Sequence, residues 1–283
     1  MRESKPRITT AHSRELGEEL RRARKRAERT GVDVCEELEW SPAKLSKLEQ
    51  GWRRTSDVEI ALLLGRCGTD RATRDRIFRL AAEHDTGYLV RPHDQQVPDT
   101  LLCLTIHERA AQSLCKYEPM MIPGLLQTED YARAMMSSYV TEHDGSIEPF
   151  VLARMERQEV LGQRKHTFFV HEAALRGVVG DRRIMRDQLL HVTLMCSWEG
   201  ITIRIVPFAA GNHLSVQTAH ALMTFSATTS PVAYVETDAA TLFLDDDAAI
   251  GTYLRKQTTL AELALGPDES RSVLARWADT YDR

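Results

Sequence analysis

The segment from Ser41 to Gly51 constrains the fold of this chain more tightly than any other. Ser41 suits the residue before a helix, and Pro42 suits the first helical position, where its missing N–H donor would be unpaired anyway. Gly51 suits the left-handed residue that follows a helix. These signals allow a helix of only about two turns. Its spacing places Leu45 and Leu48 on the inner face, and the remaining residues point outward.

Four more helices are expected around this short one. A helix capped by Ser13 should have an apolar face at steps of three and four and a basic outer face. A short segment, 32–38, precedes the turn at Glu39-Trp40-Ser41. Ser56 should cap the fourth helix, and Thr69 or Asp70 should begin the fifth. Residues 1–84 therefore predict an all-α unit of five helices.

Charge is distributed unevenly along the chain. The whole sequence has a net charge of −4. Residues 1–54, however, have 14 basic and 10 acidic side chains, and the rest has 23 basic and 31 acidic ones. A basic segment joined to an acidic body is typical of a protein that presents one part to a polyanion such as DNA. A solvated charged helix would explain the same excess.

Composition excludes several other classes of protein. The sequence has no apolar run long enough to span a membrane, and its first residues lead into no secretory signal, so a cytoplasmic location is expected. The cysteines are odd in number and never spaced as Cys-x-x-Cys, which disfavours a disulfide framework or a zinc knuckle. We expect free thiols at Cys35, Cys67, Cys103, Cys115 and Cys196.

The stretch from Thr30 to Gly51 resembles the helix-turn-helix of phage-repressor-like (Xre-type) regulators, most specifically through its pattern Ser-x-x-Lys-Leu-Ser-Lys-Leu-Glu-x-Gly. The resemblance implies a lambda-repressor-like domain whose second short helix enters the major groove of DNA. The residues that it places at base edges are Pro42, Ala43 and Lys47. Those that it places at phosphates are the Gly31 amide, Lys44, Ser46, Trp52, Arg53 and Arg54.

Two further expectations come from the same resemblance. It pairs Arg24 of the first helix with Glu49 at the end of the recognition helix, which we interpret as architecture, because a partly buried ion pair fixes geometry more than it adds stability. The family usually has Gly where this chain has Glu39. A Glu there either adopts a left-handed conformation at some cost or shifts the turn.

After a linker at 85–100, punctuated by two prolines and a glycine, residues 101–283 predict a larger α+β domain with an antiparallel or mixed sheet flanked by helices. Strands are expected at 167–170, 201–206, 232–236 and 241–244. Helices are expected at 101–113, 128–136, 146–161, 181–196, 246–265 and 267–281.

This second domain carries its own resemblance. The block at 117–133, with Pro-Gly-Leu-Leu-Gln-Thr at its centre, is followed by Arg-x-x-Arg-Gln at 154–158, Glu-Ala-Ala-Leu-Arg at 172–176, Val-Pro-Phe at 206–208 and Tyr-Val-Glu at 234–236. In this order the motifs resemble the C-terminal domain of unknown function of antitoxin-like, WhiJ-like Xre regulators of filamentous actinobacteria. The resemblance implies a transcription regulator linked to sporulation or antibiotic production, often paired with a small protein encoded nearby.

Two of these motifs permit more than one interpretation. The Pro-Gly-Leu-Leu-Gln-Thr block fits a packing corner better than a ligand-contacting loop. Arg154, Arg157 and Gln158 share one helical face, which is either solvated or binds an anion or a partner carboxylate.

Catalysis is not expected. His107-Glu108 and His171-Glu172 suggest acid–base pairs, but neither has a third group at motif spacing. A metal site from His84, His93 and Asp94 is disfavoured because flexible loops rarely preform ligand geometry. No metal, cofactor or catalytic residue is therefore assigned.

The sequence predicts a homodimeric, sequence-specific regulator of double-stranded DNA, modulated through its C-terminal domain by a small partner protein. Two alternatives remain open: an antitoxin-like interaction module that sequesters a small cognate protein, and a regulator that senses a small molecule.

Overall fold

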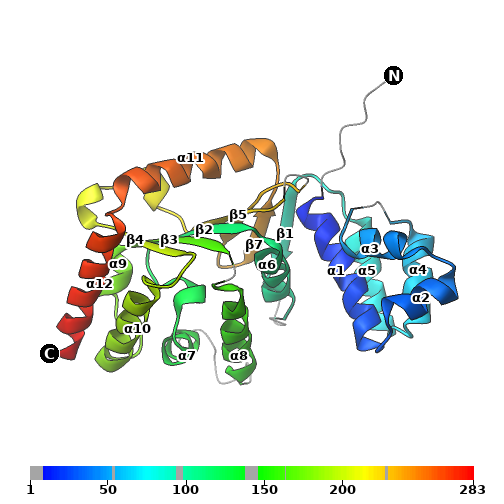
Figure 1. Ribbon diagram of the computed structural model, residues 1–283, viewed down its shortest axis with the longest axis horizontal. Helices are drawn as coiled ribbons and strands as arrows, with labels where there is room; N and C mark the ends of the chain where they lie inside the picture. Colours follow the sequence, from blue (N-terminus) through cyan, green and yellow to red (C-terminus); the bar gives the residue numbers. More distant parts are fainter. Residues whose placement is uncertain (1–8, 53–54, 94–97, 138–145, 163, 227–228) are drawn as a thin grey trace.

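The computed structural model describes residues 9–52, 55–93, 98–137, 146–162, 164–226 and 229–283, and it contains a helical unit beside a larger domain built on a sheet (Figure 1). The helical unit has five helices around one apolar core, within which Leu20, Leu48 and Ile60 are almost fully buried. The helices are α1 (Ala11–Arg26), α2 (Gly31–Leu38), α3 (Pro42–Glu49), α4 (Asp57–Arg66) and α5 (Arg71–Ala82).

The predicted caps are correct for most of these helices and wrong for the first. Ser41, Ser56 and Asp70 accept hydrogen bonds from the first-turn amides of α3, α4 and α5. α1 begins earlier than expected, because its N-cap is Thr10. Ser13 is instead the third helical residue, and its hydroxyl accepts a hydrogen bond from the Thr10 amide, which closes a capping box.

The larger domain contains a seven-stranded mixed sheet in the order β1-β7-β6-β5-β2-β3-β4. β2, β3 and β4 are parallel to one another, and the other neighbours are antiparallel. The strands are β1 (Tyr88–Pro92), β2 (Ser113–Glu118), β3 (Lys165–His171), β4 (Ile201–Val206), β5 (His220–Thr224), β6 (Val232–Glu236) and β7 (Ala240–Leu244).

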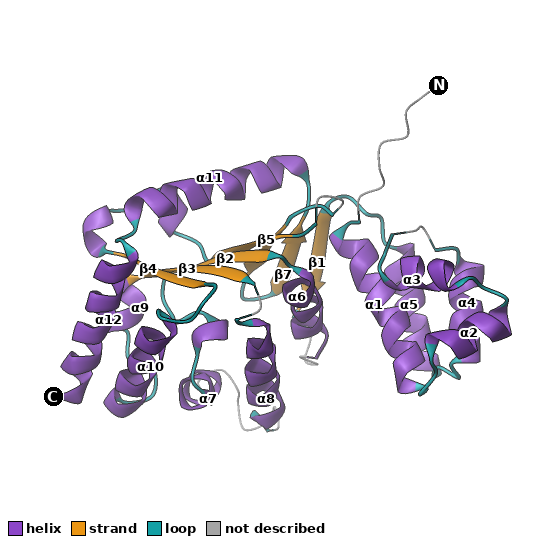
Figure 2. Cartoon of the chain, viewed as in Figure 1, coloured by secondary structure: helices purple, strands orange, loops and turns teal. Residues whose placement is uncertain are grey.

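Helices cover both faces of this sheet (Figure 2). α7, α8 and α10 lie along one face and α11 crosses the other, where Leu260 and Ile250 pack on the strands. The helices of the domain are α6 (Pro98–Ala110), α7 (Glu129–Ser137), α8 (Glu148–Glu156), α9 (Glu172–Arg176), α10 (Arg182–Met195), α11 (Asp247–Leu263) and α12 (Pro267–Asp282). Short 3-10 turns are η1 (Gly124–Leu126), η2 (Arg157–Val160), η3 (Phe208–Ala210) and η4 (Leu214–Val216).

The structure corrects the expectation that 85–100 is only a linker. β1 lies within that stretch and pairs with β7 at the edge of the sheet, so the segment after α5 and a strand about 150 residues later meet in one ladder. Residues 94–97 of this stretch lie outside the described residues. β2 and β5 lie at 113–118 and 220–224, where no strand was expected, and the helix expected at 101–113 ends at Ala110 before β2 begins.

Candidate DNA-binding surface

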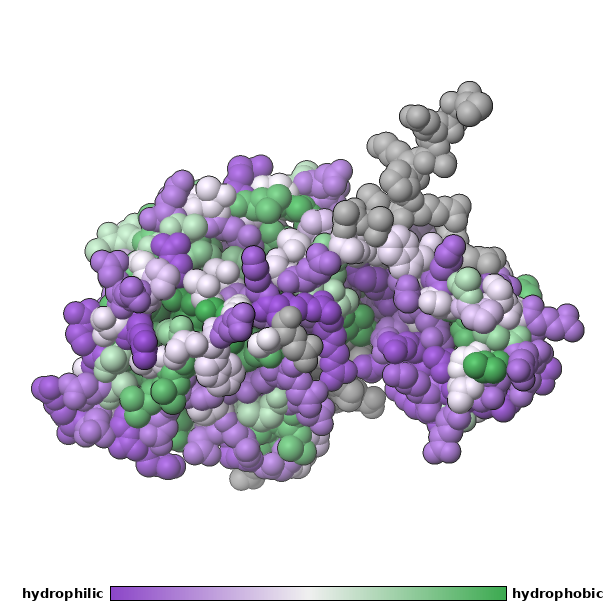
Figure 3. Space-filling model, viewed as in Figure 1, coloured by the Kyte–Doolittle hydropathy of each residue, from purple (hydrophilic) through white to green (hydrophobic). Residues whose placement is uncertain are grey.

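α3 presents one face to the core and the other to solvent. Leu45 and Leu48 are 3% and 1% exposed, which fixes the orientation of the helix. Pro42, Ala43 and Lys47, the residues expected at base edges, all lie on the exposed face. The surface of the five-helix unit that faces the viewer is mainly hydrophilic (Figure 3). A short helix exposed in this way can enter the major groove without rearranging its core.

The turn between α2 and α3 answers the question left open about Glu39. Glu39 adopts the left-handed conformation, with φ 53° and ψ 39°, as the residue that ends α2. The next residue, Trp40, is buried, and its amide donates to the carbonyl oxygen of Cys35 at 2.9 Å. The turn therefore has the left-handed residue that glycine usually provides. Because Glu39 has a Cβ atom, this backbone conformation costs free energy.

Replacing Glu39 with glycine is expected to raise the free energy of unfolding by about 1 kcal/mol, because glycine adopts this conformation without a steric penalty. It should also tighten binding to any duplex, since it removes a carboxylate beside α3. Chemical denaturation and a DNA titration at fixed salt measure the two effects.

Glu28 provides the control, because it has φ 55° at the end of α1. Glu28→Gly should raise stability by a similar amount. Glu39→Gln separates the two contributions, since it removes the charge and keeps the side chain in the left-handed conformation. An unchanged DNA affinity in both Glu39 variants would show that this carboxylate does not face the duplex.

The structure brings together the predicted pair of Arg24 and Glu49. Arg24 Nε donates to Glu49 Oε1 at 2.6 Å, and Arg24 Nη2 donates to Glu49 Oε2 at 2.8 Å. Arg24 Nη1 also donates to the carbonyl oxygen of Arg29 at 2.9 Å. This two-point contact joins α1 to the C-terminal end of α3, and its hydrogen bonds with Glu49 raise the pKa of Arg24.

Lys44 has partners that the sequence did not reveal. Its Nζ lies 3.0 Å from Glu59 Oε1 and 4.1 Å from the centre of the Trp40 ring. The ammonium group is thus already engaged by a carboxylate of α4 and by a cation–π contact. We interpret Lys44 as holding α3 against α4, and its expected contact with a phosphate would compete with these partners.

The remaining predicted phosphate contacts lie around α3. Ser46 is exposed, and its Oγ accepts from Gln50 Nε2 at 3.2 Å. Trp52 is half-buried just after the helix. Gly31 opens α2 beside a capping box in which Asp33 accepts from the Thr30 amide at 2.9 Å. Arg53 and Arg54 lie outside the described residues.

A second set of polar side chains lies inside the larger domain. Arg157 is 4% exposed and forms a two-point ion pair with Glu108 of α6, at 2.9 Å from Nε and 2.7 Å from Nη2. Arg154 Nη1 donates to Gln127 Oε1 at 2.8 Å, and Gln158 Nε2 donates to the Gln127 carbonyl oxygen at 2.6 Å. The expectation of a solvated face is therefore wrong: none of the three side chains is fully exposed, and each has partners within its own domain.

These contacts support the interpretation of the Pro-Gly-Leu-Leu-Gln-Thr block as a packing corner. Leu125, Leu126 and Gln127 are at most 1% exposed. Gly124 leaves room for the guanidinium of Arg154, because a Cβ there would lie 3.0 Å from Arg154 Nη1. Buried amides that are fully hydrogen-bonded specify a unique packing arrangement.

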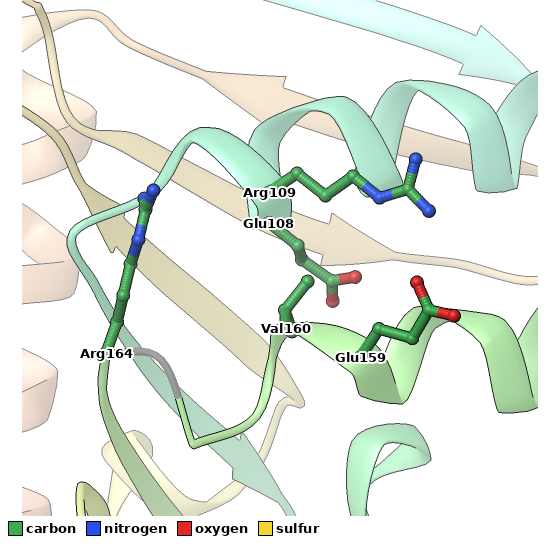
Figure 4. Close-up of a pocket in the computed structure, with 5 residues that line it drawn as sticks. All are labelled: Glu108, Arg109, Glu159, Val160 and Arg164. Atoms are coloured by element: carbon green, nitrogen blue, oxygen red, sulfur yellow. The ribbon is translucent and has the colours of Figure 1, made fainter.

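A small pocket of about 200 Å³ opens next to the buried ion pair (Figure 4). Arg109 of α6 and Glu159 of η2 lie on opposite sides of it. The Glu108 carboxylate on its wall is already paired with Arg157. The pocket therefore offers balanced charges and no free buried ion, and we assign no ligand to it.

The residues of the two suggested acid–base pairs make contacts within the fold. His107 is fully buried, its Nδ1 donates to the Cys103 carbonyl oxygen at 2.7 Å, and burial lowers its pKa to about 3. His171 Nδ1 accepts from the Ala173 amide at 3.1 Å, and Glu172 Oε2 accepts from the Phe208 amide at 3.0 Å. Each of these groups serves the fold locally.

Within the described ranges, no group of three or more His, Cys, Asp or Glu side chains is arranged to hold a metal ion. Asp94, part of the disfavoured metal set, is not among the described residues. The described helices include none that is long and apolar enough to cross a membrane. Cys35, Cys67, Cys103, Cys115 and Cys196 are all free thiols.

The geometry defines a helix-turn-helix protein, and comparison with known families agrees. Residues 15–77 match the model of a helix-turn-helix domain, and residues 103–276 match that of a domain of unknown function, DUF5753. The second match spans more than half of the chain, so the protein belongs to the DUF5753 family. No curated protein and no solved structure matches the chain.

Proposed function

We propose that the protein is a sequence-specific transcription regulator that binds double-stranded DNA through α3. The observation that carries the proposal is the exposed face of Ala43 and Lys47 on a helix fixed by Leu45, Leu48 and the Arg24–Glu49 pair. A long cationic donor beside a small apolar side chain suits the edges of guanine and the methyl group of thymine. The match to a helix-turn-helix domain supports the same conclusion.

The proposal includes a homodimer. A single helix-turn-helix makes too few contacts for strong specificity, and two half-sites about one helical turn apart roughly double them. The C-terminal domain would hold the two copies together in the cytoplasm and receive the signal, for which a small partner protein is the first candidate. Developmental or antibiotic-production control in an actinobacterium follows from the resemblance alone, and the proposed role is regulatory and not catalytic.

The test is Lys47→Ala in the full chain. A specific duplex is first selected from a random-sequence library, and affinity for it is compared with affinity for a random duplex at one salt concentration. Loss of the Lys47 contact should lower specific affinity by about 1–3 kcal/mol and change random binding much less.

Lys165→Ala is the matched control, because Lys165 is an exposed lysine at the start of β3 in the other domain. It should leave both affinities nearly unchanged. An equal loss on specific and random duplexes in Lys47→Ala would remove Lys47 from base recognition. A chain from which no specific duplex can be selected would contradict the proposed function itself.

A further inference from the structure

The first helix of the DNA-binding unit is also part of the C-terminal domain. Leu20 of α1 lies in the core of the helical unit, whereas Ala11 lies in the core of the sheet domain and is 1% exposed. The Ala11 amide donates to Asp245 Oδ2 at 2.6 Å, just after β7. Thr10 Oγ1 donates to Asp85 Oδ2 at 2.6 Å. The N-terminus of α1 is therefore fixed by residues from the segment that follows α5 and from the sheet.

Arg91 of β1 is the main charged contact across this junction. Its Nε donates to Glu15 Oε1 of α1 at 3.0 Å, and its Nη1 donates to Glu83 Oε2, just after α5, at 3.1 Å. The Arg91 side chain is 16% exposed, and that of Glu15 is 12% exposed. The Arg91 guanidinium thus connects the edge strand β1 to α1, the first helix of the DNA-binding unit, and to the residue that follows α5, its last helix.

The middle and the C-terminal part of α1 hold the recognition helix. A Cβ at Gly17 would lie 2.7 Å from the Glu49 carbonyl oxygen and 2.8 Å from that of Leu48, so the two backbones are in direct contact. The Arg24–Glu49 pair adds a second point. A rotation of α1 against the sheet would therefore rotate α3 with it.

The junction is more polar than a permanent core. Arg14 is 7% exposed and contacts the Thr9 carbonyl oxygen at 3.0 Å, but its Nε and Nη2 have no hydrogen-bond partner among the described residues. Burial lowers the pKa of Arg14 to about 10. Unpaired buried donors offset much of the gain from docking. The orientation of the unit thus depends on the few well-paired polar contacts at the junction, which are those of Arg91, Thr10 and Ala11.

We propose that Arg91 is a positioning residue that sets the spacing between DNA half-sites accepted by the dimer. The inference rests on the proposed function. If both DNA-binding units of a dimer are held rigidly, they can bind only half-sites at one separation and one helical phase. If the units are held loosely, they can bind half-sites at several separations, but each complex is weaker because the pair is no longer preorganised.

The experiment uses the full-length protein and duplexes with two selected half-sites whose separation varies by single base pairs, together with a duplex that carries one half-site. The wild type should bind one spacing best. Arg91→Ala should weaken binding at that spacing about tenfold and flatten the profile, because the effective concentration of the second unit falls. The affinity of Arg91→Ala for the single half-site should stay within about twofold of the wild-type affinity. A misfolded α3 would lower this affinity much more.

Glu15→Gln, which keeps the side-chain shape, should change the profile in the same direction and covers the case in which Arg91→Ala fails to fold. Arg22→Ala is the control, because the Arg22 side chain lies away from the junction and pairs along α1 with Glu18 at 3.5 Å. Amide hydrogen exchange should rise at the N-terminus of α1 in Arg91→Ala and remain slow around Leu63 in α4.

An unchanged spacing profile in Arg91→Ala and Glu15→Gln, with specific binding intact, would overturn the inference and leave the proposed function in place. An equal loss on one half-site and on two would also overturn it, because the effect would then lie in α3 itself. If the wild type selects no specific duplex, the proposed function fails first.

Discussion

Replacing Arg157 with methionine is expected to lower the free energy of unfolding by about 3–5 kcal/mol, because it leaves the Glu108 carboxylate buried without its partner. Glu108 and Arg157 are each at most 4% exposed. Chemical denaturation of the full chain, followed by a signal from the larger domain, measures the loss.

The double variant Glu108→Leu with Arg157→Met tests whether this loss comes from the unpaired carboxylate. Replacing both members of a buried pair with apolar groups removes the desolvation cost together with the attraction, so its stability should return close to that of the wild type. Arg283→Met tests an exposed pair, since Arg283 contacts Asp279 at the surface, and should cost about 0–1 kcal/mol. A double variant as unstable as Arg157→Met would show that the pair is needed for more than charge balance.

Gly17→Ala should also destabilise the protein, by about 1–3 kcal/mol, although alanine favours helices over glycine. The added methyl group would have to displace the backbone of α3 or α1, since the nearest atoms are backbone atoms of Leu48, Glu49 and Gly51 and not flexible side chains. Affinity for specific DNA should fall as well, because α3 carries the proposed reading face. Denaturation and the DNA titration report the two effects separately.

Gly65→Ala is the matched control, because Gly65 lies within α4 and a Cβ there meets nothing within 4 Å. This change should raise stability by about 0.5–1 kcal/mol through helix propensity alone. A gain in stability for Gly17→Ala similar to that for Gly65→Ala would contradict the direct backbone contact between α1 and α3.

The features that could be predicted from the sequence are those determined by residues close together in the chain. Ser41, Pro42 and Gly51 lie within eleven residues and correctly bound α3, and the mixed helix-and-sheet architecture follows from periodicity in segments such as 201–206. The sequence does not show which of several nearby hydroxyl groups will cap a helix. The N-cap of α1 is Thr10 and not Ser13. The contact with Asp245 explains this choice, and it lies far away in the sequence.

The features that were missed depend on distant partners. β2 carries Lys116 and Glu118 on the same face of the strand, which obscures the apolar pattern of a buried strand; the two side chains pair with each other at 3.1 Å. The ion pair between Lys44 and Glu59 could not be predicted from the residues around Lys44. The interpretation of Arg157 likewise depended on Glu108, 49 residues away. Pairing across such distances is decided by tertiary packing, which no local spacing reports.

The contact between Ala11 and Asp245 joins residues 234 positions apart, and this has a consequence for synthesis. A chain emerges from the ribosome N-terminus first, and its domains fold as units. The helical unit can therefore form early, but its first helix gains its final anchor only after β7 has been made. A product truncated before residue 245 would carry the DNA-binding helices without that anchor. Synthesis as far as Asp245 is thus required before the first helix of the DNA-binding unit has all of its contacts.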